Sequence, residues 1–277
     1  MSRTSKLLVP AVALLGLLGA ACGSDSSAAT TSSVSVTTAA PTTMAPTTTE
    51  PAVIGEVKVS AASSLTEAFT AIGAAFSTEH PGAKATFDFA ASSDLVKQIA
   101  EGADAAVFAS ADQANMTKLT DAGDNGAQPV VFATNSLEII VEPGNPKHIT
   151  GVADLAKPDL IVVTCDPQVP IGKYSQQVFT NAGVTVTPKS LEQNVKGIVT
   201  KVTLGEADAG IVYATDVAAA GAKAAGVEIP ANLNVVAQYP LVVTKRAADS
   251  VAARAFVDFV LGEQGRKILG SYGFTGP

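Results

Sequence analysis

Apolar and polar residues follow a strand-then-helix pattern at two places early in the folded part of the chain. Residues 56–60 alternate polar and apolar side chains, which is typical of a strand, and apolar residues then recur every three or four positions, which is typical of one helix face. The apolar residues on that face are Leu65, Ala68, Phe69, Ile72 and Phe76. The same order returns with a strand pattern over residues 84–89 and a helix pattern over residues 94–99. The chain therefore opens with two strand–helix units.

The remaining apolar runs continue this alternation. Strands are predicted over residues 105–109, 137–141, 160–163, 209–213 and 239–243, and helices over residues 172–182, 195–203 and 251–262. Strands that alternate with helices predict an α/β fold with mainly parallel sheets flanked by helices. A region of this length would form one large sheet or two lobes. Because no long linker interrupts it, two lobes would be joined by strands that cross between them.

Both early strand–helix junctions carry paired serines, Ser63 with Ser64 and Ser92 with Ser93. Ser64 and Glu67 also fit the S-x-x-E pattern of a capping box. A serine at such a position commonly does no more than cap its helix, which is worth about 1 kcal/mol. A helix N-terminus also presents free N–H groups and a partial positive charge, so hydroxyls beside it can help to bind an anion. The pattern alone leaves both interpretations open.

The first residues have the layout of an export signal. Arg3 and Lys6 precede an apolar stretch over residues 7–18, and small residues follow before Cys22. This stretch is shorter than the ~20 residues that a membrane span requires. Small residues directly before a cysteine resemble a bacterial lipoprotein signal, which implies that residues 1–21 are removed and that Cys22 carries the lipid. The alternative is ordinary secretion in which Cys22 has no role.

The segment after this signal, residues 22–54, consists largely of Ser, Thr, Ala and Pro and contains almost no large apolar side chain. Such a composition cannot bury a core, so this segment is expected to be a disordered or extended tether. The folded part is therefore expected to begin near Gly55.

Composition excludes several classes of function. The 277 residues carry 18 Lys and Arg against 25 Asp and Glu, a net charge of −7, so no nucleic-acid partner is expected. Aromatic residues make up only 5% and tryptophan is absent, which argues against a surface that stacks sugars or bases. The two cysteines, Cys22 and Cys165, form neither a disulfide framework nor a metal or redox motif. Cys165 is expected to be a buried residue at the end of a strand.

Common catalytic and nucleotide-binding motifs are absent from the sequence, including G-x-S-x-G, H-E-x-x-H, the P-loop and G-x-G-x-x-G after a strand. The two histidines, His80 and His148, stand in turn-like segments where a solvated side chain is the ordinary outcome. An exported serine hydrolase would require a base beside Ser64 or Ser92. A protein that performs no catalysis is therefore expected, and the hydrolase is kept as an alternative.

Three serine-containing motifs follow one another over residues 59–68, 89–95 and 108–112. In this order and spacing they resemble the molybdate-binding proteins that serve ABC importers. The resemblance continues through later motifs and covers essentially residues 55–277. These later motifs lie at residues 135–137, 166–174, 194–197, 210–213 and 272–274.

The resemblance implies a two-lobed type II periplasmic binding protein fold with two crossover strands that form a hinge. Lobe 1 would consist of residues 55–132 plus 239–277, and lobe 2 of residues 133–238. The crossing strands would lie near residues 132–139 and 237–243.

The resemblance also implies a site for one oxyanion between the lobes. Ser64 and Ser92 would each offer a hydroxyl and a backbone N–H. Ile171 and Val195 would each offer a backbone N–H, and Tyr213 a hydroxyl. Taken singly, Ile171, Val195 and Tyr213 would be interpreted as core residues. Their role in the site is implied only by their positions in the motifs that resemble those of the family.

Two positions depart from the family pattern. Ile171 stands where alanine is common, which a backbone role tolerates. Many members carry an acidic residue just before the apolar strand that precedes the S-A-D motif, and this chain has Ala106 there. The second departure bears on the hinge and on contacts between the lobes more than on the anion site.

The function implied by the resemblance is capture of molybdate, and of tungstate, for delivery to an ABC permease. The protein would be a monomer, anchored by the lipid on Cys22 to the outer face of the cytoplasmic membrane, with no cofactor and no site for a free metal cation. Sulfate or another tetrahedral oxyanion is the alternative ligand, because donor spacing is not visible in the sequence. A surface module that senses or adheres is a further alternative.

Overall fold

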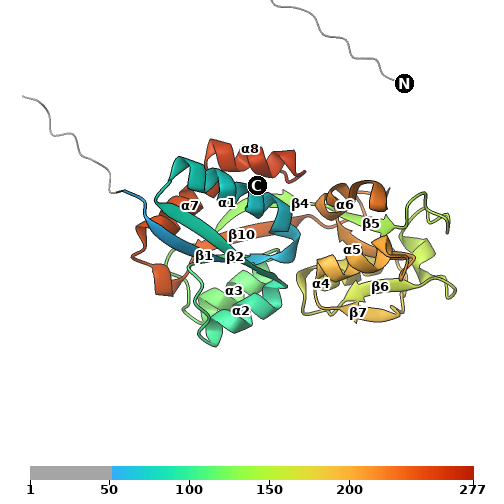
Figure 1. The fold of residues 1–277 in the computed structure, drawn as a ribbon. Coiled ribbons are helices and arrows are strands. Elements are labelled where there is room, and N and C mark those ends of the chain that lie inside the picture. Colours follow the sequence, from blue (N-terminus) through green and yellow to red (C-terminus); the bar gives the residue numbers. More distant parts are fainter. Residues whose placement is uncertain (1–51) are drawn as a thin grey trace, which may run out of the picture. The chain divides into compact units, whose positions relative to one another are not determined.

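The computed structural model describes residues 52–277. The predicted signal, Cys22 and most of the predicted tether lie outside the described residues, and the first strand begins at Gly55. The described residues form two five-stranded sheets, which Figure 1 shows as two groups of strands, each with its own helices. None of the helices in this part of the chain is both long and apolar enough to cross a membrane.

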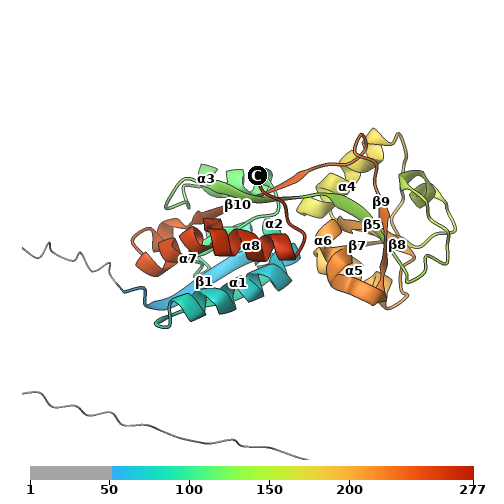
Figure 2. The same cartoon turned by 90° about the horizontal axis from the view of Figure 1, so that it is seen from above.

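The first sheet has the strand order β2-β1-β3-β10-β4. Its strands are β1 (Gly55–Ala62), β2 (Ala83–Ala90), β3 (Val107–Ala109), β4 (Val130–Asn135) and β10 (Ala237–Val243). Its helices are η1 (Ser63–Leu65), α1 (Thr66–Glu79), α2 (Ser92–Ala100), α3 (Gln113–Asp121), η4 (Lys245–Ala247), α7 (Val251–Leu261) and α8 (Glu263–Ser271). In Figure 2, α1, α7 and α8 lie together on one side of this sheet, with α3 on the other.

The second sheet has the strand order β7-β6-β8-β5-β9. Its strands are β5 (Leu137–Val141), β6 (Val162–Cys165), β7 (Ser190–Glu192), β8 (Ala209–Tyr213) and β9 (Ala225–Glu228). Its helices are η2 (Val152–Ala156), α4 (Pro170–Asn181), α5 (Val195–Thr203), α6 (Ala214–Ala220) and η3 (Gly221–Lys223). Figure 2 shows α4 across the strands from α5.

One strand in each sheet runs against the others. β1 pairs in parallel with β2 and β3, and β6 pairs in parallel with β7 and β8, as strand–helix–strand units require. β10 is antiparallel to both of its neighbours, β3 and β4, and β5 is antiparallel to both β8 and β9. The pairing is therefore mixed, although four of the five strands in each sheet point the same way, in keeping with the α/β prediction.

Two connections cross between the sheets. β4 ends at Asn135 in the first sheet, and after a single intervening residue β5 begins at Leu137 in the second. The chain returns between β9 and β10, over residues 229–236. In this return segment the side chain of Asn234 accepts a hydrogen bond from the Leu137 N–H (3.1 Å) and donates one to the Leu137 carbonyl (2.9 Å). One amide side chain thus holds the two crossing segments together.

Aromatic rings form much of the core beneath α1. The ring of Phe69 lies with its centroid 5.6 Å from Phe132 and 6.2 Å from Phe256, and Phe76 lies 5.3 Å from Phe256. The predicted apolar face of α1 is fully buried in this cluster. Because α1 is clamped along its length, its N-terminal end, where the paired serines stand, has a fixed position.

The elements that bear the other predicted site residues begin or end close to where the sequence predicts. α5 and β8 have the predicted bounds, and α4 begins two residues early, at Pro170. Proline is favoured at the first position of a helix because the N–H that it lacks would have no partner inside the helix.

Candidate functional site

The predicted capping box at Ser64 does not form. The chain first makes the short 3-10 turn η1, so α1 begins at Thr66 and the Thr66 hydroxyl donates to the Ser63 carbonyl (2.7 Å). The Ser64 hydroxyl instead lies 3.0 Å from the Tyr239 hydroxyl on β10. The prediction was wrong because a tertiary partner outcompetes the local cap.

Ser92 does not cap its helix either. It is the first residue of α2, whose cap position is Ala91, and its hydroxyl oxygen accepts a hydrogen bond from the Ala111 N–H (3.0 Å). A hydroxyl that accepts one bond still has its proton to donate. Ser92 is 1% exposed, so that proton must find a partner inside the protein or in a ligand.

One small cavity brings together all five residues that the sequence singled out. Ser64 and Ser92 come from the first sheet's helix starts, and Ile171, Val195 and Tyr213 come from the second sheet. The rest of the lining is one further serine and alanine, valine and proline residues, so within the described part of the chain the lining contains no carboxylate, lysine, arginine or histidine. The centre of a water molecule can reach about 10 Å³ of the cavity, close to the room for a single water. The cavity therefore suits a ligand of a few atoms and not a sugar or peptide.

Helix starts supply backbone donors on the second-sheet side of the cavity. Ile171 is the second residue of α4 and Val195 is the first residue of α5, and the first N–H groups of a helix have no partner within it. The side chains of both residues are buried in the core, so each can offer the cavity only its backbone N–H. The start of α5 is held by Asn194, whose side chain accepts from the Gly197 N–H (3.3 Å).

The turn that precedes α4 packs closely against the helix. The Val169 N–H donates to the Asp166 carbonyl (2.9 Å), and the Gln168 N–H donates to the Asp166 side chain (2.8 Å). A Cβ atom at Gly172 would lie 2.2 Å from the Asp166 carbonyl oxygen. Only glycine therefore allows this turn to place the α4 N-terminus at the cavity.

Tyr213 contributes a buried hydroxyl to the cavity. Among the described residues its phenol has no hydrogen-bond partner, although the residue is only 1% exposed. Burial raises the pKa of Tyr213 well above its ordinary value, so the hydroxyl stays protonated and remains a donor. A buried donor without a partner costs about 1–3 kcal/mol, which a ligand acceptor would relieve.

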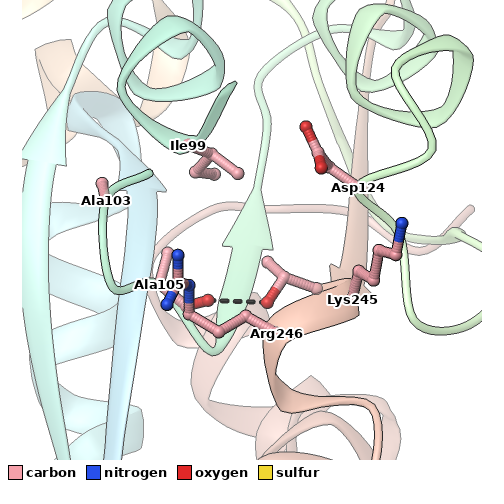
Figure 3. Close-up of a pocket in the computed structure, with 7 residues that line it drawn as sticks. Ile99, Ala103, Ala105, Asp124, Lys245 and Arg246 are labelled. Carbon is pink, nitrogen blue, oxygen red and sulfur yellow. Dashed lines mark hydrogen bonds between the residues drawn. The ribbon is translucent and has the colours of Figure 1, made fainter. Parts of the chain in front are cut away.

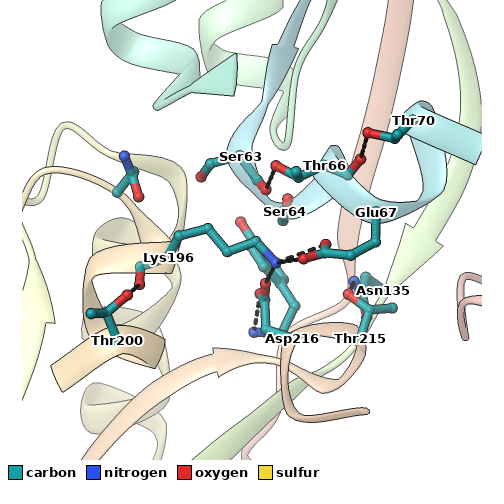
Figure 4. Close-up of polar contacts among 12 residues, drawn as sticks. Ser63, Ser64, Thr66, Glu67, Thr70, Asn135, Lys196, Thr200, Thr215 and Asp216 are labelled. Carbon is teal, nitrogen blue, oxygen red and sulfur yellow. Dashed lines mark hydrogen bonds and ion pairs between the residues drawn. The ribbon is translucent and has the colours of Figure 1, made fainter. Parts of the chain in front are cut away.

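Beside the cavity, three charged groups meet across the two sheets (Figure 4). The Lys196 ammonium on α5 lies 2.8 and 2.9 Å from the two Glu67 carboxylate oxygens on α1, and 3.0 Å from Asp216 Oδ1 on α6. Asp216 Oδ2 also accepts from the Tyr213 N–H (3.3 Å). The positive charge of Lys196 is therefore engaged by two carboxylates, and none of the three side chains lines the cavity.

A larger cavity of the first sheet contains none of the predicted residues (Figure 3). Asp124, Lys245 and Arg246 line it together with small and apolar side chains, and its volume is about 330 Å³. The Thr244 hydroxyl on its wall is already bonded to the Ala105 carbonyl (2.6 Å). This lining carries charged side chains of both signs, unlike the neutral lining of the smaller cavity.

The residues that a hydrolase would use lie away from the serines. The His80 ring packs on Phe76, 4.9 Å between centroids, and His148 stands in a turn with positive φ. Cys165 is buried at the end of β6, as expected, and burial raises the pKa of its thiol. Ala106 precedes β3 and does not line the cavity.

Comparison with known proteins places this arrangement in a family. Residues 57–275 match the family model described as bacterial extracellular solute-binding protein. The chain belongs to this family. Among its relatives, the molybdate-binding protein ModA of Mycobacterium tuberculosis (strain ATCC 25618 / H37Rv) is 40% identical over 270 residues, which cover 98% of this chain and 97% of the relative.

Solved structures support the same fold for this solute-binding protein. The substrate-binding domain of a putative molybdenum ABC transporter from Clostridium difficile is 28% identical, with a TM-score of 0.61 over 80% of this chain and 99% of that one. The sulfate-binding protein SubI from Mycobacterium tuberculosis H37Rv is 20% identical, with a TM-score of 0.72 over 80% of this chain and 86% of that one, a likeness that concerns the fold alone. The two-lobed α/β solute-binding fold expected from the sequence is thereby confirmed.

In this solute-binding protein, the groups that hold the site in place carry no local signal of that role in the sequence. They are Tyr239, Ala111 and the three charged residues Glu67, Lys196 and Asp216, although Lys196 lies inside the N-V-K-G motif and Asp216 follows Tyr213 by three residues. Their partners are distant in the chain, so no local pattern points to them.

Proposed function

We propose that this protein captures molybdate, and tungstate, as an exported binding protein and delivers the anion to an ABC permease. The observation that carries the proposal is that the buried Tyr213 hydroxyl has no partner among the described residues, at a cavity that neutral hydrogen-bond donors line. The 40% identity to ModA of Mycobacterium tuberculosis over nearly the full length of both chains supports molybdate as the ligand.

Neutral donors suit a dianion that must be bound and later released. The hydroxyls of Ser64, Ser92 and Tyr213, together with backbone N–H groups at Ile171 and Val195, would surround the oxygens without a fixed countercharge. A backbone N–H cannot accept a hydrogen bond, so within this set only the hydroxyl oxygens could accept the proton of an oxyanion such as hydrogen phosphate, whereas all five groups can donate to a fully deprotonated one. The donor set therefore favours a fully deprotonated tetrahedral anion.

The mechanism that we propose is closure of two lobes around the anion. Lobe 1 would be residues 55–132 plus 239–277 and lobe 2 residues 133–238, so that Ser64 and Ser92 belong to one lobe and the other three site residues to the second. In the open form each lobe holds part of the donor set, and the anion completes both parts when the lobes close. The permease would recognise the closed form, and the protein itself would perform no chemistry.

Cys22 would anchor the protein by a lipid to the outer face of the cytoplasmic membrane, as a monomer on its tether. The order of the first residues, with basic, apolar and small segments directly before Cys22, supports this assignment. Expression of Cys22→Ser in a bacterial host tests it, with membrane and soluble fractions compared. Wild-type protein is expected in the membrane fraction and the variant outside it, and an unchanged distribution would contradict the anchor.

Calorimetric titration of the protein with molybdate, tungstate, sulfate and phosphate at pH 7 to 8 tests the ligand. One-to-one binding of molybdate and tungstate is expected, with weaker sulfate and weaker still phosphate. A preference for sulfate would reassign the protein to the alternative ligand, and a lack of binding by all four anions would refute the proposal.

A further inference from the structure

We propose that Lys196 is a latch between the two lobes, which forms its full set of ion pairs only in the closed conformation and so sets how slowly the bound anion escapes. This inference rests on the proposed oxyanion-binding function and adds to it a residue outside the cavity.

The two ion pairs of Lys196 differ in where their carboxylates stand. Asp216 lies in the first turn of α6 and Lys196 in the first turn of α5, both on the second sheet, whereas Glu67 lies in the first turn of α1 on the first sheet (Figure 4). The Lys196–Asp216 pair therefore moves as one body with lobe 2. The contact between Lys196 and Glu67, at 2.8 and 2.9 Å, is the one that must break when the lobes separate.

Burial explains why Lys196 stays on Asp216 when the other contact breaks. The Asp216 side chain has no exposed surface, whereas those of Lys196 and Glu67 are 27% and 41% exposed. A buried carboxylate without a cation is strongly unfavourable, but a carboxylate at the surface is readily hydrated. Lys196 is therefore held by Asp216 in both conformations and is aimed at the place that Glu67 occupies on closure.

The latch is connected to the anion site through the backbone. Lys196 directly follows Val195, Glu67 lies one helical turn after Ser64, and Asp216 accepts a hydrogen bond from the Tyr213 N–H (3.3 Å). The movement that brings Ser64 towards Val195 and Tyr213 thus brings Glu67 to Lys196. The Lys196–Glu67 ion pair stabilises only the closed form, so it should lower the Kd for the anion and slow its dissociation.

Variants of Glu67 test the latch without altering the residues that line the cavity. For Glu67→Gln we expect the Kd for molybdate to rise about two- to fivefold, the range for a partly exposed ion pair, mainly through faster dissociation. Glu67→Lys places two ammonium groups together and is expected to raise the Kd further. High salt should weaken binding by the wild type and have a smaller effect on Glu67→Gln.

A matched control is Glu101→Gln, which removes the same charge from the same lobe. Glu101 pairs with Lys97 within one helix region at 3.9 Å, so lobe closure leaves this pair intact. We expect its Kd, dissociation rate and salt dependence to match the wild type. The latch is refuted if Glu67→Gln, Glu67→Lys and Glu101→Gln have the same Kd, dissociation rate and salt dependence. It is also refuted if Glu67→Lys leaves the dissociation rate unchanged.

Hydrogen exchange separates failure of the latch from failure of the proposed ligand. Because the Lys196–Glu67 ion pair favours the closed form, it should raise the fraction of ligand-free protein that is closed. The amides at the start of α5 should therefore exchange faster in Glu67→Lys than in the wild type even without any anion. If the wild type binds none of the oxyanions but exchanges these amides more slowly than Glu67→Lys does, the molybdate assignment is refuted and the latch is retained. Wild-type protein that binds molybdate, with exchange and dissociation unchanged in Glu67→Lys, would refute the latch and retain the ligand.

Discussion

The rings of Tyr213 and Tyr239 lie 5.7 Å apart at an interplanar angle of 65°, yet their hydroxyls have different surroundings. The Tyr239 hydroxyl shares a hydrogen bond with Ser64 (3.0 Å), whereas that of Tyr213 has no partner among the described residues and lies at the cavity. Burial raises the pKa of both phenols well above the ordinary value, so both stay protonated. The Tyr239 hydroxyl is therefore already bonded within the protein, and the Tyr213 hydroxyl can donate to a ligand.

Tyr213→Phe is expected to weaken molybdate binding and to stabilise the fold. Removal of a donor to a charged acceptor should raise the Kd about 10- to 100-fold. Removal of a buried hydroxyl without a partner should raise the free energy of unfolding by about 1 kcal/mol. Calorimetry and chemical denaturation measure the two quantities. A variant that loses stability, or keeps its affinity, would contradict the assignment of Tyr213.

Tyr239→Phe is the matched variant for that comparison. It removes a hydroxyl that is already bonded to Ser64, so we expect a loss of about 1 kcal/mol in unfolding free energy and a smaller effect on affinity than at Tyr213. Ser64→Ala should weaken oxyanion binding, since Ser64 then offers only its N–H, and should also lower the free energy of unfolding by about 1 kcal/mol because the buried Tyr239 hydroxyl loses the same hydrogen bond. Equal effects of the two tyrosine variants on affinity would mean that both hydroxyls contact the ligand.

Ser92→Ala is expected to reduce both affinity and stability. The substitution leaves the buried Ala111 N–H without its acceptor, which should lower the free energy of unfolding by about 1–3 kcal/mol, and it removes one donor from the cavity. Ser93→Ala, one position along the same helix turn and partly exposed, is the control and should change neither quantity appreciably. Loss of stability with no loss of affinity would limit Ser92 to a structural role.

Asp216→Asn should stabilise the protein at pH 7 and above and lose that advantage in acid. Burial raises the pKa of Asp216, and Lys196 offsets this only in part, which leaves it at about 6. Between the ordinary aspartate value and about 6, the folded state holds a proton that the unfolded state has released, so acidification stabilises the wild type through this group. The asparagine variant lacks this dependence and should therefore gain stability relative to the wild type as the pH rises through about 6.

Denaturation of both proteins at pH 5 and pH 7.5 measures this difference. The gap in unfolding free energy should narrow towards pH 5. A gap that is constant with pH, or that widens in acid, would contradict the raised pKa of Asp216.

Gly172→Ala should destabilise the protein strongly. The added Cβ would lie 2.2 Å from the Asp166 carbonyl oxygen, a backbone atom that cannot move without displacing the turn before α4. We expect a loss of at least about 2 kcal/mol in unfolding free energy, together with weaker anion binding. Gly151→Ala is the control, because apart from Gly151 itself and its chain neighbours no atom of residues 52–277 lies within 4 Å of its Cβ position. Normal stability of Gly172→Ala would show that the turn is not as rigid as its packing indicates.

Local patterns predicted the elements well where a single helix or strand carries its own signal. The bounds of α5 and β8 follow from apolar periodicity alone, and the buried end of β6 at Cys165 follows from its apolar run. The capping box at Ser64 was wrong because its hydroxyl partner, Tyr239, lies 175 residues away in the chain. A short-range rule cannot anticipate such a competitor.

The strand–helix order, the serine-bearing helix starts and the family of this protein can all be predicted from the amino-acid sequence, because periodicity and motif order are properties of neighbouring residues. The tertiary structure was needed to find which hydroxyl has no partner among the described residues and which carboxylates pair with Lys196. Tyr213 and Tyr239 are alike in sequence terms, and Lys196 and Glu67 are 129 residues apart. Hydrogen bonds and ion pairs require atoms to lie within about 3 Å in the right direction, and that geometry exists only once the two sheets and their helices have packed.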